Sequence, residues 1–291
     1  MNLPKVKKIL KWIGIILLAL IVILFLLMNF AMPFKDSDKK LAEYLNRADI
    51  TLSIQHLAVD NYNIRVVNTH KKGVAPDTNI IFIHGAPGSL SDFKAFLKDN
   101  SLLDKYNLIA IDRPGYGASN SGQAEPGIAK QAQLLLKVID QLNLQNLILV
   151  GHSYGGPIAA KMATLAPQKV KGLLLLAPVN EPISEPRYKI SWLAIYPPIK
   201  WLIPGAVYTS AVEKIAHPGE IEKLIPFWKQ IKCKTIHIHG DKDFLAPPSN
   251  MDFTKKLIPK EHYELIRLPN ENHFLPWTQH SRITDVLITK F

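Results

Sequence analysis

The feature that most constrains the fold is the run at 146–157, which reads Asn-Leu-Ile-Leu-Val-Gly-His-Ser-Tyr-Gly-Gly-Pro. The apolar residues up to Val150 predict a strand buried on both faces, and the alanines after the glycines predict a helix lying close on a sheet. Ser153 would then occupy a sharp strand-to-helix turn, where Gly151 and Gly155 avoid side-chain collisions. The pattern predicts a nucleophilic serine beside the positive end of a helix. An ordinary Gly/Ser turn is the alternative, because so short a motif arises by chance in roughly one such chain in ten.

Strands and helices are predicted to alternate along most of the chain. Leu52–Leu57 and Ile64–Val67 alternate apolar and polar residues and predict an antiparallel hairpin. Later strands are predicted at 79–84, 107–111, 147–150, 172–176, 234–239 and 263–268, and helices near 91–99, 127–142, 154–166, 250–257 and 276–290. This alternation predicts an α/β fold with a mostly parallel sheet covered by helices on both faces, and a ligand site at the carboxyl ends of the strands.

Two segments depart from that alternation. Residues 181–230 are rich in proline and aromatic residues and are predicted to form short helical stretches. Trp12 to Phe34 is a run of 23 residues without a charge, long enough to cross a bilayer as a helix. We therefore expect a retained membrane anchor in residues 1–34 and a polar connector in 35–49. A cleaved signal peptide is the competing interpretation, but its apolar core is normally shorter and is followed by a cleavage site.

Charge and cysteine content limit the classes of function. The net charge is +11, and the first 34 residues hold four lysines and no acid, which leaves +7 on the rest. The lysines before the apolar run favour an N-terminus inside the cell and a body outside it, and a basic body suits anionic lipid. Nucleic-acid binding is disfavoured, because no Lys/Arg run exceeds two residues. Cys233 is the single cysteine, so an internal disulfide and a thiolate zinc site are excluded.

Polar motifs follow the predicted strands at the points where the strands end. Because the carboxyl ends of parallel strands meet at one edge of a sheet, we expect these motifs to lie together. They are His84-Gly85-Ala86-Pro87-Gly88, Asp112-Arg113-Pro114-Gly115, Gly151-His152-Ser153-Tyr154-Gly155, His239-Gly240-Asp241-Lys242-Asp243 and Asn270-Glu271-Asn272-His273. With these motifs, residues 50–291 resemble the α/β-hydrolase superfamily, with 181–230 as its variable cap.

The resemblance implies a serine hydrolase, and we expect neither a cofactor nor a metal. Ser153 would be the nucleophile, His273 the general base and then acid, and Asp243 the residue that orients the imidazole. The backbone N–H groups of Ala86 and Tyr154 would form the oxyanion hole. These roles agree with general chemistry, because a serine needs a base to remove its proton and the base needs a carboxylate to fix its tautomer.

Other assignments of these residues stay open at this point. Asp241 and Glu181 are alternative positions for the acid. His237 and His239 alternate on one strand and so share a face, and together with Asp241 and Asp243 they superficially resemble a metal site. His84 is expected to brace the oxyanion loop. Asp112 and Arg113 are expected to form a structural loop beside the site, with a possible ion pair between them.

The function predicted from these observations is hydrolysis of carboxylic esters with apolar acyl groups, near lipid. The substrate would be a small molecule, and the anchor would contact membrane lipid. Within enzymes, the alternatives are an aminopeptidase of the proline-iminopeptidase type, a thioesterase, a C–C bond hydrolase and a cofactor-free haloperoxidase. A catalytically idle receptor or scaffold on the same fold is the alternative outside enzymes.

Overall fold

The computed structural model describes residues 3–26, 35–182 and 189–291. One eight-stranded sheet runs through the body in the order β1-β2-β4-β3-β5-β6-β7-β8. The first two strands pair antiparallel, β2 pairs antiparallel with β4, and the remaining pairs are parallel. The strands are β1 (Ile50–Val59), β2 (Tyr62–Lys71), β3 (Asn79–Ile83), β4 (Asn107–Ile111), β5 (Leu147–His152), β6 (Val170–Leu176), β7 (Lys234–Gly240) and β8 (Tyr263–Leu268).

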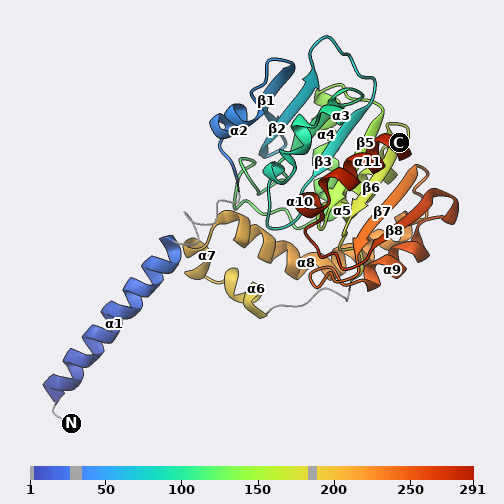
Figure 1. The fold of residues 1–291 in the computed structure, drawn as a ribbon. Coiled ribbons are helices and arrows are strands. Elements are labelled where there is room, and N and C mark those ends of the chain that lie inside the picture. Colours follow the sequence, from blue (N-terminus) through green and yellow to red (C-terminus); the bar gives the residue numbers. More distant parts are fainter. Residues whose placement is uncertain (1–2, 27–34, 183–188) are drawn as a thin grey trace.

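Helices cover both faces of the sheet (Figure 1). In β3, Ile81 and Ile83 belong to one hydrophobic core and Ile80 and Phe82 to the other, as the two-residue period of a strand requires. One core includes α4, α5 and part of α8, and the other includes α2, α3, α10 and α11. The helices of the body are α2 (Asp38–Leu45), α3 (Asn100–Leu103), α4 (Ile128–Gln141), α5 (Gly155–Leu165), α6 (Lys189–Ala194), α7 (Ile199–Leu202), α8 (Gly205–Trp228), α9 (Ser249–Leu257), α10 (Leu275–Thr278) and α11 (His280–Lys290).

The hairpin, the parallel strands and the mostly parallel sheet predicted from the sequence are confirmed. The helix predicted near 91–99 is wrong. That segment forms two short 3₁₀ turns, η2 (Leu90–Phe93) and η3 (Phe96–Lys98). Ser89 caps the first turn together with Asp92, and Ser91, where the predicted helix begins, is inside the turn. The predicted C-terminal helix is divided into α10 and α11.

The region 181–230 also differs from its prediction of short helical stretches. Besides α6 and α7, it contains the 24-residue helix α8, with Pro218 and Pro226 inside it. Residues 183–188 lie outside the described part of the chain. The buried side chains of Ile221, Leu224 and Trp228 pack into the same core as α5. This tertiary packing outweighs the loss of a helical hydrogen bond at each proline.

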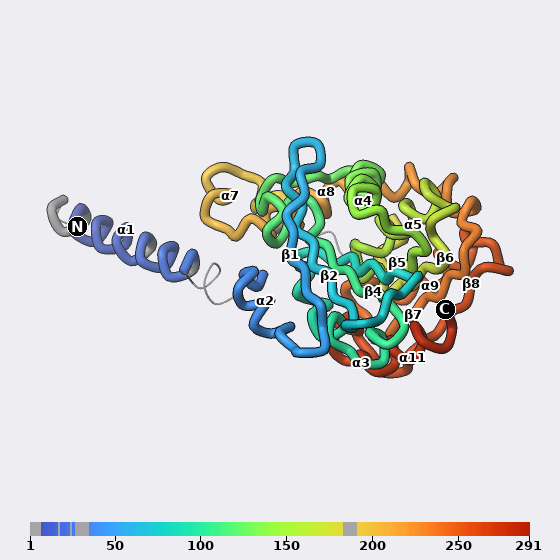
Figure 2. Tube along the Cα trace, turned by 90° about the horizontal axis from the view of Figure 1, so that it is seen from above, coloured from blue at the N-terminus to red at the C-terminus, as the bar shows by residue number. Residues whose placement is uncertain are grey.

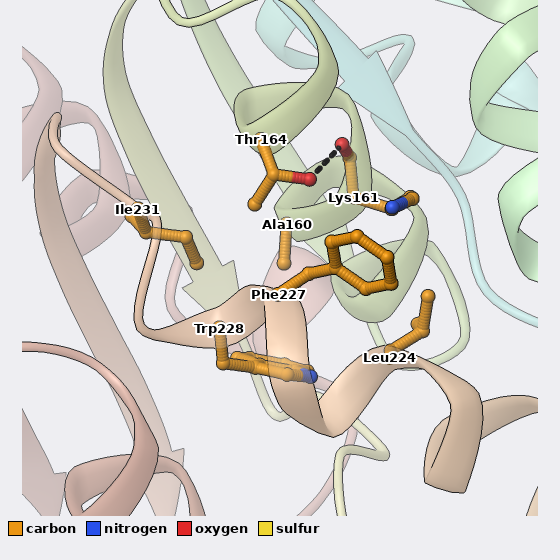
Figure 3. Close-up of a pocket in the computed structure, with 7 residues that line it drawn as sticks. All are labelled: Ala160, Lys161, Thr164, Leu224, Phe227, Trp228 and Ile231. Carbon is orange, nitrogen blue, oxygen red and sulfur yellow. Dashed lines mark hydrogen bonds between the residues drawn. The ribbon is translucent and has the colours of Figure 1, made fainter.

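The contact between α5 and α8 leaves a small gap, which is lined by residues of both helices (Figure 3). The gap measures about 10 Å³, which is at the lower limit of the space that a single water needs. The Lys161 ammonium lies 3.3 Å from the centre of the Phe227 ring, and Trp228 is 2% exposed. This part of α8 therefore serves packing rather than ligand binding.

A single helix, α1 (Leu3–Leu26), extends away from the body (Figures 1 and 2). Large apolar side chains along it are exposed, including Trp12 at 56% and Leu18 at 62%. Within the described ranges, no helix meets the combination of length and apolar character needed to span a membrane. The span predicted from Trp12 to Phe34 includes residues 27–34, which lie outside those ranges.

Candidate active site

The turn between β5 and α5 has the geometry predicted for Ser153. The φ angle of Ser153 is +52°, a left-handed conformation that non-glycine residues seldom adopt. A Cβ at Gly151 would lie 2.5 Å from the Gly155 carbonyl oxygen, and one at Gly155 would lie 2.2 Å from that of Ile83. Only glycine fits at either position. The backbone N–H of Ser153 donates to the Leu176 carbonyl at 2.9 Å, which ties the turn to β6.

The loops after β7 and β8 bring an acid and a histidine into contact. His273 Nδ1 lies 2.7 Å from Asp243 Oδ2, and both side chains are buried. The other oxygen of Asp243 accepts the backbone N–H groups of Leu245 and Ala246 at 2.9 and 2.8 Å. With its Nδ1 proton donated to the carboxylate, the imidazole keeps Nε2 as a proton acceptor.

The alternative acids differ from Asp243 in their contacts. Asp241 accepts the backbone N–H of Asn270 at 2.7 Å and so stabilises the loop. The backbone N–H of Glu181 donates to the Asn250 side chain at 2.8 Å, and one oxygen of the Glu181 carboxylate is buried without a hydrogen-bond partner. Of the three acids considered from the sequence, Asp243 is the one in contact with His273.

Ser153 and His273 line the same cavity, which we call the serine cavity and whose volume is about 310 Å³. Its wall combines residues of the loop after β3 with apolar and charged side chains from distant parts of the chain. The lining residues are Gly85, Ala86, Pro87, Asp92, His152, Ser153, Lys214, Leu245, His273, Phe274 and Trp277.

His152 stabilises the position of His273. Its Nε2 donates to the His273 backbone carbonyl at 3.0 Å, and the two rings lie 4.9 Å apart. Burial, together with the nearby His273, lowers the pKa of His152 to about 3, so this ring is neutral at ordinary pH. Because the His152 ring is neutral, it places no positive charge beside His273.

The histidines of β7 form a hydrogen-bonded chain. His237 Nε2 lies 3.0 Å from His239 Nδ1, and His239 Nε2 lies 2.8 Å from the Ala246 carbonyl oxygen. Tyr263 completes the chain, with its hydroxyl 2.8 Å from His237 Nδ1. Burial holds the pKa of both histidines below the usual range. No group of three or more metal-ligating side chains occurs in residues 3–26, 35–182 and 189–291.

The loop that carries Ala86 is held from behind by Arg113. The guanidinium donates to the carbonyls of His84 and Gly85, each at 2.9 Å. The His84 ring donates from Nδ1 to the same Gly85 carbonyl at 2.7 Å and accepts the Arg113 backbone N–H at 3.0 Å. The Gly85 carbonyl and the Ala86 N–H belong to one planar peptide group. These bonds therefore fix the direction of the Ala86 N–H, and His84 braces the loop as expected.

Arg113 is in turn paired with Glu213 of α8. The two guanidinium nitrogens lie 2.6 and 3.2 Å from the carboxylate oxygens, and both side chains are fully buried. Burial opposes ionisation of Arg113, but the Glu213 carboxylate raises its pKa above the ordinary value. The predicted pair between Asp112 and Arg113 is wrong: Asp112 binds Arg65 at 2.7 Å instead. Sequence reasoning missed Glu213, which is 100 residues from its partner.

The comparisons with known proteins agree with this architecture. The model of the alpha/beta hydrolase fold family matches residues 78–218. A dihydrolipoyllysine-residue acetyltransferase component of the acetoin cleaving system from Cupriavidus necator is 30% identical over 51% of this chain and 41% of its own length. A Mycoplasma pneumoniae protein whose name places it among esterases and lipases is 34% identical over 35% of this chain and 38% of its own length. The chain therefore spans less than half the length of these curated relatives.

A solved structure of a bacterial membrane phospholipase A superposes with a TM-score of 0.61 at 19% identity, covering 98% of this chain and 100% of the other. At that identity the likeness concerns the fold. The sheet order, the serine turn and the match over residues 78–218 together show that the chain has the α/β-hydrolase fold.

Proposed function

We propose that the protein is a serine hydrolase that cleaves carboxylic esters through an acyl-enzyme on Ser153. The observation that carries the proposal is the contact of His273 with Asp243 in the cavity that Ser153 lines. An imidazole oriented in this way beside a serine is the arrangement that converts a weak hydroxyl nucleophile into a reactive one.

In the acylation step, His273 Nε2 takes the Ser153 proton while the hydroxyl oxygen attacks the ester carbonyl. The Asp243 carboxylate stabilises the imidazolium that forms. The N–H groups of Ala86 and Tyr154 stabilise the oxyanion, and such donors contribute roughly 2.7–4 kcal/mol each in the transition state. His273 then donates its proton to the departing alcohol. In the second step it activates a water, which releases the carboxylic acid and restores Ser153.

Two observations support ester substrates with apolar acyl groups. The serine cavity is lined in part by Leu245, Phe274 and Trp277. These side chains offer apolar surface to an acyl chain. The relative from Mycoplasma pneumoniae and the structurally similar phospholipase also carry names that concern esters or lipids.

A substrate panel tests this proposal. We expect p-nitrophenyl esters of increasing acyl length to be hydrolysed, and Ser153→Ala to lower kcat by at least about four orders of magnitude. Prolyl anilides, thioesters and C–C bond substrates assayed beside them discriminate the alternative enzymes. Faster turnover of any of these than of the best ester would contradict ester specificity.

We also propose that the N-terminal segment holds the enzyme at a membrane, with the body outside the cytoplasm. The exposed apolar side chains of α1 support this, because water solvates them poorly. The full chain should remain in the membrane fraction after carbonate extraction, and external protease should digest its body in intact cells. Recovery of the full chain in the soluble fraction would contradict the anchor, and digestion only after lysis would contradict the orientation.

A further inference from the structure

A second cavity adjoins the serine cavity. It measures about 340 Å³ and shares three wall residues with the serine cavity: Pro87, Asp92 and Trp277. Pro87 directly follows Ala86, whose N–H is assigned to the oxyanion hole. The two cavities therefore border each other along this wall. We call the second one the lysine cavity, because three lysines line it: Lys35, Lys40 and Lys94.

A buried carboxylate brings two of these ammonium groups together. Lys40 Nζ lies 2.7 Å from one oxygen of Asp36, and Lys94 Nζ lies 2.8 Å from the other. The Asp36 side chain is only 8% exposed, whereas the side chains of Lys40 and Lys94 are 63% and 34% exposed. An ammonium has three N–H donors, so each lysine can bind Asp36 and still donate to a ligand.

The charge balance of the lysine cavity is positive. Burial opposes ionisation of Asp36, but the hydrogen bonds from Lys40 and Lys94 lower its pKa below the ordinary value, so it carries one full negative charge. Burial raises the pKa of Asp92 to about 7, so this second carboxyl is only partly ionised near neutral pH. Three lysines therefore face less than two negative charges.

We propose that the lysine cavity binds a phosphate group carried by the alcohol part of the ester substrate. This inference rests on the proposed hydrolysis at Ser153 and narrows its substrate class to acyl esters of short phosphorylated alcohols, such as an acylated glycerol phosphate. A phosphate suits the cavity because its several oxygens can accept hydrogen bonds from more than one ammonium at once. The apolar wall near Leu245 and Phe274 receives the acyl chain, and the lysines receive the other end of the molecule.

A pair of matched esters tests the inference. The two substrates are hexanoylglycerol and hexanoylglycerol 3-phosphate, assayed as monomers. We expect the wild type to show the lower KM for the phosphate ester. Lys40→Gln and Lys94→Gln should each raise that KM by up to about fivefold and leave the KM of the neutral ester unchanged. Lys94→Arg should retain the preference.

Lys130→Gln is the matched control, because Lys130 forms a similar exposed ion pair with Asp60 on another part of the body. It should alter neither KM. Equal KM values for the two esters in the wild type would overturn the inference that the lysine cavity binds phosphate. Hydrolysis of both esters would still support the proposed function. The inference would also be overturned if Lys130→Gln weakened the preference as much as Lys94→Gln did.

Direct binding keeps the test independent of catalysis. Glycerol 3-phosphate should bind the full chain in calorimetric titration, with weaker binding to the Lys40→Gln/Lys94→Gln double variant and unchanged binding to Lys130→Gln. Absence of binding would overturn the inference even if neither ester were hydrolysed. If the double variant lost affinity only for phosphatidylglycerol vesicles, and not for glycerol 3-phosphate, the lysines would serve a membrane surface and the substrate assignment would be wrong.

Discussion

Glu213→Gln tests the link between α8 and the loop after β3 that carries Ala86. The Glu213 carboxylate is fully buried and accepts four hydrogen bonds: two from Arg113, one from Tyr116 at 2.6 Å and one from Gln131 at 2.7 Å. The substitution keeps the shape of the side chain but removes its charge. The buried guanidinium of Arg113 then lacks a counterion, which costs about 3–5 kcal/mol of unfolding free energy.

The same substitution should lower kcat and leave KM nearly unchanged. Arg113 holds the Gly85 carbonyl, and the peptide group of that carbonyl carries the Ala86 N–H. A loosened peptide would weaken the donor that we propose for the oxyanion of the transition state, so kcat should fall while KM changes little. Complete loss of an oxyanion donor lowers kcat about 10²–10³-fold, and partial misalignment should lower it roughly tenfold to a hundredfold.

Urea unfolding and ester kinetics on the same preparations measure both effects. Glu220→Gln is the control, because Glu220 is also on α8 and contacts the body by accepting the Ile128 N–H at 3.0 Å. It should cost no more than about 1 kcal/mol and leave kcat unchanged. The double variant Arg113→Met/Glu213→Leu should lose less unfolding free energy than Arg113→Met and Glu213→Leu lose when their separate effects are added. Its kcat should still be low, because Arg113 no longer holds the Gly85 carbonyl. Equal kcat values in Glu213→Gln and Glu220→Gln would refute the effect of Glu213 on catalysis. Strictly additive losses of unfolding free energy in the double variant would refute an energetic coupling between Arg113 and Glu213.

Two further predictions concern stability. Burial raises the pKa of Asp92 to about 7, above the 3.8 expected in the unfolded chain, so the stability associated with its protonated form is complete below pH 4 and lost as pH rises through 7. The unfolding free energy of Asp92→Asn, measured with urea, should therefore rise relative to that of the wild type by on the order of 2–4 kcal/mol between pH 4 and 8. A difference between the two proteins that stays the same over this pH range would contradict the prediction. Gly155→Ala should prevent folding, because its Cβ would lie 2.2 Å from the Ile83 carbonyl oxygen. Gly219 lies inside α8, and a Cβ there would have no atom within 4 Å, so Gly219→Ala should stabilise the protein by about 0.5–1 kcal/mol. Equal melting temperatures of the two glycine variants would contradict both predictions.

Elements with a local signal could be predicted from the sequence. The alternation of apolar residues in β1 and β2 and the glycines around Ser153 each reflect a constraint within a few residues. The proximity of Asp243 and His273 also follows from local information, because both come directly after parallel strands. The structure places both of them where the strand ends predict.

Features that depend on tertiary contacts could not be predicted in the same way. Pro218 and Pro226 disfavour a helix locally, and α8 continues through them because its buried face packs on α5. The pairing of Arg113 with Glu213 joins residues 100 positions apart, with no motif to relate them. The start of the helix predicted near 91–99 is also wrong, because Ser89 caps a 3₁₀ turn that begins at Leu90.

Covalent labelling of the folded protein with a fluorophosphonate, followed by peptide mapping, tests most directly whether Ser153 is the nucleophile. We expect one adduct, on Ser153, formed in wild type and formed at least about a thousandfold more slowly in His273→Ala, because the hydroxyl then lacks its base. An adduct on another residue, or none in folded protein, would contradict the assignment of Ser153 as the nucleophile.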